Sequence, residues 1–175
     1  MESILKLIFL LNSISLPLSI LIIDLLTRQK ENVISISDFV RIGKDPLIFL
    51  EIVLMSGNFI QAIFSLYLFI NHGFPLFIIF GALAGLIGIL VSFTRIDKYY
   101  KRHTLMTIAS LALYSISILV TSILLGNSLM ILIGLIQIIG VTLGFGLKLK
   151  TKHIEVFYFT LFGIWNILII ATFLK

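Results

Sequence analysis

Four uncharged apolar runs dominate the chain, and their lengths predict its helices. Residues 7–23 and 156–174 each have about the length of one membrane crossing, whereas the runs 52–94 and 104–147 are about twice as long. A helix that crosses a bilayer needs about 20 apolar residues, so each long run predicts two crossings. The chain therefore contains enough apolar sequence for six spans.

A turn signal near the middle divides each long run. Gly73 precedes Pro75 in the first run, and Gly126 precedes Asn127 in the second. Glycine commonly follows the last residue of a helix, and proline is accepted in the first turn of the next one. The chain is thus predicted to be an all-α polytopic membrane protein, with residues 1–175 forming a single domain that is a six-transmembrane-helix bundle. Its spans are expected at about 4–26, 48–70, 74–94, 104–125, 129–147 and 154–174.

The composition supports a membrane protein and excludes several kinds of chemistry. Hydrophobic residues make up 59% of the chain and charged residues 12%, and the mean hydropathy is +1.18. So few polar side chains could not cover the surface of a soluble domain. Because the chain has no cysteine, it has no thiol nucleophile, iron–sulfur cluster or cysteine zinc site.

The basic residues are divided unevenly between the two ends of the predicted bundle. Lys6 and Lys175 lie at the end that has both termini and the two tight turns. Eleven of the 13 basic residues lie at the other end: Arg28, Lys30, Arg41, Lys44, Arg95, Lys98, Lys101, Arg102, Lys148, Lys150 and Lys152. The positive-inside rule makes this second end cytoplasmic and both termini extracytoplasmic. The net charge of +5 is accordingly interpreted as a topology signal and a source of contacts with anionic lipid, not as a nucleic-acid surface.

Two of the predicted helices carry a stripe of polar residues on one face. The first stripe steps by three or four residues from Glu51 through Asn58 to Ser65, and the second begins at His103 and passes through Tyr114. A helix that turned such a face to lipid would leave polar groups unsatisfied, so both stripes are expected to face the interior.

These stripes predict a polar site near the cytoplasmic interface. Glu51, Asn58 and His103 are expected to converge there, with Arg95 and Arg102 attracting an anionic headgroup. The alternative is that these charged groups form interfacial ion pairs and extend their side chains to water.

Glycines in the third and fifth predicted helices indicate close helix packing. Gly81 and Gly85 form a GxxxG pair, and Gly140 and Gly144 form another. Glycine lets two membrane helices approach closely, and we expect these four residues to be packing positions.

The sequence contains none of the common short catalytic motifs and predicts neither a cofactor nor a metal site. His72 is expected at the opposite end from His103 and His153, which disfavours a three-histidine metal centre. HExxH, GxSxG and Walker motifs are absent from the sequence.

Two stretches resemble the DRAM (damage-regulated autophagy modulator) family. The first is Ile36-Ser37-Asp38 followed by Ile48-Phe49, and the second is Phe93-Thr94-Arg95 followed by His103. The relatives of that family include GPI-lipid-remodelling proteins and uncharacterised archaeal and bacterial proteins with six spans. The resemblance implies lipid handling or a role in membrane trafficking. It also implies cytoplasmic termini, opposite to the orientation indicated by the basic residues, which we retain.

Three functions are compatible with this sequence. The first is an integral protein, expected in the plasma membrane, that binds or organises lipid without catalysis, with the lipid tail between the second, fourth and sixth helices. The second is a small lipid-modifying enzyme or proton-coupled carrier that uses Glu51 and His103. The third is an accessory subunit of a larger membrane complex. Membrane lipids are the expected partners in the first case, and other membrane subunits in the third.

Overall fold

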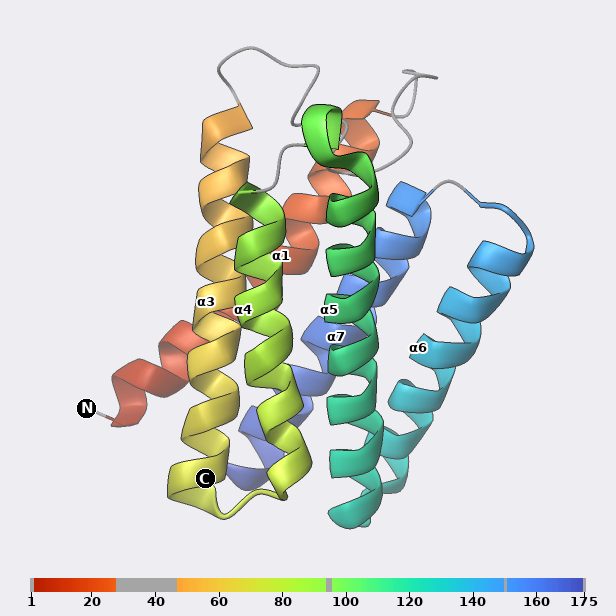
Figure 1. The fold of residues 1–175 in the computed structure, drawn as a ribbon. Helices are drawn as coiled ribbons and strands as arrows, with labels where there is room; N and C mark the ends of the chain where they lie inside the picture. The colour runs from red at the N-terminus through yellow and green to blue at the C-terminus, as the bar shows by residue number, and fades with distance from the viewer. Residues whose placement is uncertain (1, 28–46, 94–95, 150, 175) are drawn as a thin grey trace.

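A computed structural model of the chain describes residues 2–27, 47–93, 96–149 and 151–174 (Figure 1). The described part is helical throughout and contains no strand, which confirms the all-α prediction for these residues. Its elements are α1 (Glu2–Thr27), α3 (Leu47–His72), the 3₁₀ helix η1 (Leu76–Ile78), α4 (Ile79–Phe93), α5 (Ile96–Leu124), α6 (Ser128–Gly146) and α7 (Thr151–Phe173).

Five of these helices are long and apolar enough to cross a membrane. The spans are Glu2–Ile22, Ile52–His72, Lys101–Leu124, Ser128–Gly146 and His153–Phe173, and a shorter apolar stretch covers Leu76–Val91. Only 28% to 39% of each span is buried inside the bundle, so most of its apolar side chains face outward. A surface this apolar is favourable in contact with the hydrocarbon of a bilayer and unfavourable in contact with water. It indicates an integral membrane protein.

The helices form a closed ring of neighbours in chain order. Packing contacts join α1 to α3, and then each helix to the next as far as α7, which packs back against α1 (Figure 1). In the view of Figure 1, α3, α4 and α5 lie in front of α1 and α7. This ring surrounds a narrow interior into which each helix turns one face.

Both predicted tight turns occur where the glycines are. Gly73 has a φ of 62° and Gly126 a φ of 65°, the left-handed conformation that glycine adopts without steric cost. Beyond the first turn, the amide of Phe74 donates to the carbonyl of Leu68 at 3.2 Å. Beyond the second, the side chain of Asn127 accepts a hydrogen bond from the amide of Met130 and caps α6.

Two helices begin at positions that differ from the predicted spans. Pro75 precedes η1 with a ψ of 146°, so the helical segment predicted from residue 74 begins at Leu76. In contrast, α5 begins at Ile96 and includes charged residues ahead of the predicted span 104–125. Lysine and arginine are good helix formers, so the helix continues beyond its apolar section.

Candidate functional site

The interior of the ring contains a network of uncharged polar side chains, beginning with Asn58 on α3. The hydroxyl of Tyr114 on α5 donates to Asn58 Oδ1 at 3.3 Å, and Asn58 Nδ2 donates to the carbonyl of Leu54 at 2.9 Å. Both side chains are buried, as is Ser110, whose hydroxyl donates to the carbonyl of Ala84 at 2.8 Å. The polar stripes of α3 and α5 therefore meet inside the bundle.

A pair of amides links α3 to α7 across the ring. Asn166 Nδ2 donates to Gln61 Oε1 at 2.9 Å, and Gln61 Nε2 donates to Asn166 Oδ1 at 3.5 Å. The exposed fraction is 3% for Gln61 and 0% for Asn166. Each amide therefore satisfies the other in a place that neither water nor lipid reaches.

Further hydrogen bonds join α7 to its other neighbours. The hydroxyl of Tyr158 donates to the carbonyl of Leu111 at 3.0 Å, and Trp165 Nε1 donates to Ser122 Oγ at 2.8 Å. On the side of α6, Gln137 Nε2 donates to the carbonyl of Tyr158 at 3.3 Å. The ring centroids of Tyr114 on α5 and Phe162 on α7 lie 4.7 Å apart, so the two aromatic rings pack between these helices.

This packing occupies the interior where the sequence analysis expected a lipid tail. Trp165, Tyr114 and Tyr158 are among the largest fully buried side chains and lie between α5 and α7. Because these side chains fill the gap between α3, α5 and α7, an acyl chain would have to displace the core.

The structure describes only some of the residues predicted to bind a headgroup. Asn58 is buried in the network, and His103 is 6% exposed near the beginning of α5. Arg102 is exposed. The side chain of Glu51 and the whole of Arg95 lie outside the described residues, so the predicted convergence of Glu51 with His103 stays a prediction.

The residues that suggested the family resemblance are described even less fully. Ser37 and Asp38 lie outside the described residues, as do the side chains of Phe49 and Phe93. Of the five positions that make the resemblance specific, only His103 has a described side chain.

The four glycines predicted to be packing positions all lie close to a neighbouring helix. A Cβ atom at Gly81 would lie 2.6 Å from Ser65 Oγ, and one at Gly85 would lie 2.6 Å from the backbone oxygen of Asn58. The third glycine, Gly140, faces the ring of Phe157, and Gly144 faces Ile154 with an approach of 2.9 Å. Here α4 approaches α3, and α6 approaches α7, more closely than a larger residue would allow.

The last helix, α7, carries residues that bond across the bundle, as the polar residue Asn166 in its apolar run indicates. Glu155, which is 6% exposed, lies on the same face of this helix as Phe162 and Asn166, seven and eleven residues later. The contacts of Phe162 and Asn166 show that this face looks toward α5 and α3. The spacing of Glu155, Phe162 and Asn166 places them on one face of the helix and is visible in the sequence. Nothing in the sequence indicates that Asn166 pairs with Gln61.

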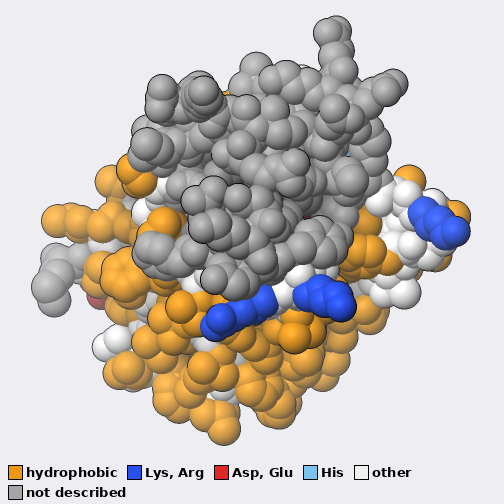
Figure 2. All heavy atoms as spheres, turned by 45° about the horizontal axis from the view of Figure 1, so that its top comes forward, with side chains coloured by type: hydrophobic (Ala, Val, Ile, Leu, Met, Phe, Trp, Pro, Cys, Tyr) orange, Lys and Arg blue, Asp and Glu red, His pale blue; other side chains and the backbone are white. Residues whose placement is uncertain are grey.

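Three exposed cations lie at one end of the bundle. Lys101 and Arg102 lie near the beginning of α5, Lys148 follows the end of α6, and all three are exposed. We call this the basic end. Figure 2, in which the top of Figure 1 comes forward, shows Lys and Arg side chains there above a flank of hydrophobic side chains. Lys6 lies instead on α1 far from this end, in an ion pair with Glu2 at 3.0 Å.

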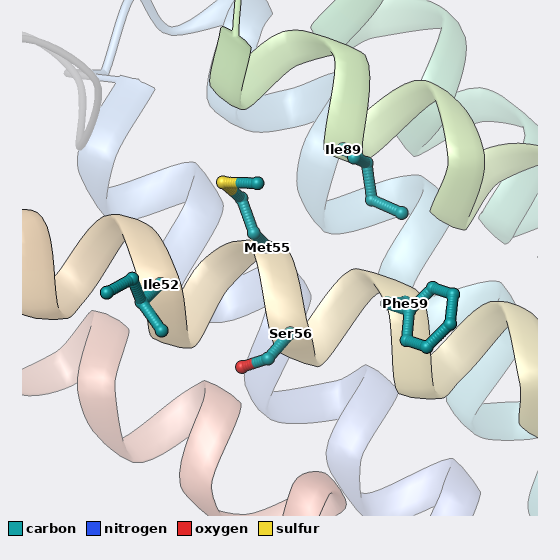
Figure 3. A pocket seen from close by; sticks show the side chains of 5 residues that line it. All are labelled: Ile52, Met55, Ser56, Phe59 and Ile89. Carbon is teal, nitrogen blue, oxygen red and sulfur yellow. The ribbon is translucent and has the colours of Figure 1, made fainter.

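A shallow apolar groove lies on the outer surface between α3 and α4 (Figure 3). Its volume is about 400 Å³, and its lining residues are Ile52, Met55, Ser56, Phe59 and Ile89. Among the described residues, no cluster of His, Asp and Glu side chains could hold a metal ion. The described part of the chain thus presents a packed interior with a network of uncharged polar side chains, a cationic end and an apolar outer groove.

Comparison with known proteins found no matching family model, curated protein or solved structure.

Proposed function

We propose that this protein binds or organises membrane lipid without catalysing a reaction, with an anionic headgroup at its basic end. The observation that carries the proposal is the gathering of exposed Lys101, Arg102 and Lys148 at one end of an otherwise apolar bundle. Each Lys or Arg near an anionic membrane surface contributes roughly 1 kcal/mol of attraction. The amides of Gln61 and Asn166 and the side chains of Tyr114 and Trp165 are buried and hydrogen-bonded inside the bundle, whereas these cations are exposed.

The test is the lipid that remains on the gently solubilised protein, measured by native mass spectrometry. The wild type is expected to retain phosphatidylglycerol in preference to phosphatidylcholine when both are supplied in equal amounts. Replacing Lys101 and Arg102 together with Gln should lower this preference by roughly tenfold or more, because two cations are lost. Lys6→Gln is the matched control, since it removes a cation away from the basic end. Equal retention of the two lipids by the wild type would overturn the proposal.

We propose further that the six long helical segments in the described part of the chain all cross the membrane. Together η1 and α4 span Leu76–Phe93, and the rise per residue of the two helix types gives them a length of about 28 Å. This is close to the roughly 30 Å of the hydrocarbon core. A six-span chain has both termini on one side, and the basic residues favour the extracytoplasmic side of the plasma membrane.

Cysteine labelling tests this orientation in a chain that has no cysteine of its own. A cysteine at Ser128 should react with an impermeant thiol reagent in intact cells, whereas cysteines at Lys98 and Lys150 should react only after lysis. The reverse pattern would overturn this orientation and would support the DRAM-like one, with cytoplasmic termini.

A second candidate function is a proton-coupled carrier or small lipid-modifying enzyme. The observation in its favour is that His103 and Glu155, two ionisable residues, are both buried near the basic end of their helices. Intramembrane ionisable residues commonly mark proton pathways. Proton flux into proteoliposomes tests the carrier: flux that exceeds that of empty vesicles and is lost in His103→Gln and Glu155→Gln would favour it. Stoichiometric protein partners in the native mass spectrum would instead favour an accessory subunit.

A further inference from the structure

A shallow apolar groove of about 400 Å³ lies on the outer face of α3 and α4. Four of its lining residues, Ile52, Met55, Ser56 and Phe59, come from α3, and Ile89 comes from α4 (Figure 3).

The chemistry of the lining favours hydrocarbon over any polar ligand. Its one polar side chain, Ser56, donates its hydroxyl hydrogen to the carbonyl of Val53 at 3.1 Å, a bond within its own helix. The lining therefore presents carbon and the thioether of Met55 to a ligand. Methionine is unbranched and flexible, so it adapts to a chain of variable shape.

The position of the groove suits an acyl chain that hangs from a headgroup at the basic end. The lining residues of α3 begin five residues after Leu47, where α3 starts, and extend over two helical turns, which is roughly 10 Å. On the other side, Ile89 lies four residues before the end of α4. The next helix, α5, packs against α4 and carries Lys101 and Arg102 near its beginning. The groove thus begins at the end of the bundle that carries these cations and runs toward the middle of the bundle.

We propose that this groove binds one acyl chain of an anionic phospholipid whose phosphate contacts the cations of the basic end. The inference rests on the proposed function, because it names the place and the part of the lipid that the protein holds. The positive charge above the groove selects an anionic headgroup, and the apolar lining holds the chain below it.

Photocrosslinking tests this assignment on the full-length protein. The protein is placed in vesicles of phosphatidylglycerol and phosphatidylcholine, with a trace of phosphatidylglycerol that carries a diazirine in the middle of one acyl chain. After irradiation, peptide mass spectrometry locates the adducts, which are expected on Met55, Phe59 or Ile89. Ser56→Phe fills the groove and should lower these adducts by roughly tenfold, the effect of losing about two buried methylene contacts.

Thr142→Phe is the matched control for this substitution. Like Ser56, Thr142 is exposed and its hydroxyl donates to a carbonyl of its own helix, that of Ile138, but it lies on α6 away from the groove. This variant should retain the wild-type adducts. Phe59→Ala, which widens the groove without adding bulk, gives a second variant and should also reduce adduct formation.

The outcomes separate this assignment from the function on which it rests. If phosphatidylglycerol is retained but its adducts are spread evenly over the lipid-facing helices, or are unchanged in Ser56→Phe, the groove assignment is wrong and lipid binding stands. Equal retention of phosphatidylglycerol and phosphatidylcholine by the wild-type protein would overturn both proposals.

Discussion

The amide pair between Gln61 and Asn166 should contribute stability only while both amides are present. Replacing Gln61 with Leu keeps a side chain of similar size but leaves the amide of Asn166 buried without its partner. An unsatisfied buried polar group costs about 1–3 kcal/mol, and coupling energies measured inside membrane proteins average about 0.6 kcal/mol with a maximum near 1.7 kcal/mol. Two bonds are lost here, one of them long at 3.5 Å. We therefore expect Gln61→Leu to lower the free energy of unfolding by about 1–2 kcal/mol.

The double variant Gln61→Leu/Asn166→Leu supplies the decisive comparison. It replaces both amides with apolar groups and leaves neither unsatisfied, so its stability should return to within about 0.5 kcal/mol of the wild type. The assay is reversible unfolding in mixed detergent micelles, followed by helical circular dichroism and by the fluorescence of Trp165, the only tryptophan in the chain. Single-variant effects that simply add in the double variant would refute the argument, because independent sites show no coupling.

Three further substitutions test close packing and buried hydrogen bonding in the bundle. Gly85→Ala would place a Cβ atom 2.6 Å from the backbone oxygen of Asn58 and should lower the melting temperature measurably, whereas Gly146→Ala, which meets nothing within 4 Å, should leave it unchanged or raise it. Equal effects of the two glycine substitutions would contradict this close approach. Ser65→Ala removes a buried hydroxyl that has no hydrogen-bond partner among the described residues, so we expect unchanged or slightly higher stability in the same melting assay. A loss above about 1 kcal/mol would show that this hydroxyl is bonded.

The neutral interior network has a consequence for how this bundle is held together. Lipid tails are as apolar as leucine side chains, so apolar burial alone supplies little force between helices inside a bilayer. The bonds of Tyr114, Trp165 and the Gln61–Asn166 pair cross the ring between helices that are distant in the sequence. We infer that these bonds select one arrangement of helices from the several that a similar apolar surface would accept.

The helices and turns of this protein follow from short stretches of sequence. A membrane helix satisfies its backbone hydrogen bonds within its own segment, and the bilayer sets its length, so the apolar runs predict the spans without knowledge of their neighbours. Gly73 and Gly126 end their helices for an equally local reason, since each adopts a positive φ. The separation of basic residues into one set of connections is likewise visible in the sequence.

The partners of the interior residues could not be predicted in the same way. Gln61 and Asn166 lie 105 residues apart, and each appears in the sequence as one polar residue in an apolar run. The polar stripes indicated the inward faces of α3 and α5, but the remaining runs are more evenly apolar, so their pattern does not reveal how far each of those helices is rotated. The return of α7 to α1, the filled gap around Trp165 and the groove beside Met55 depend on that rotation and on which helices are neighbours. These features arise from the shapes of side chains in contact, which the hydropathy pattern does not encode.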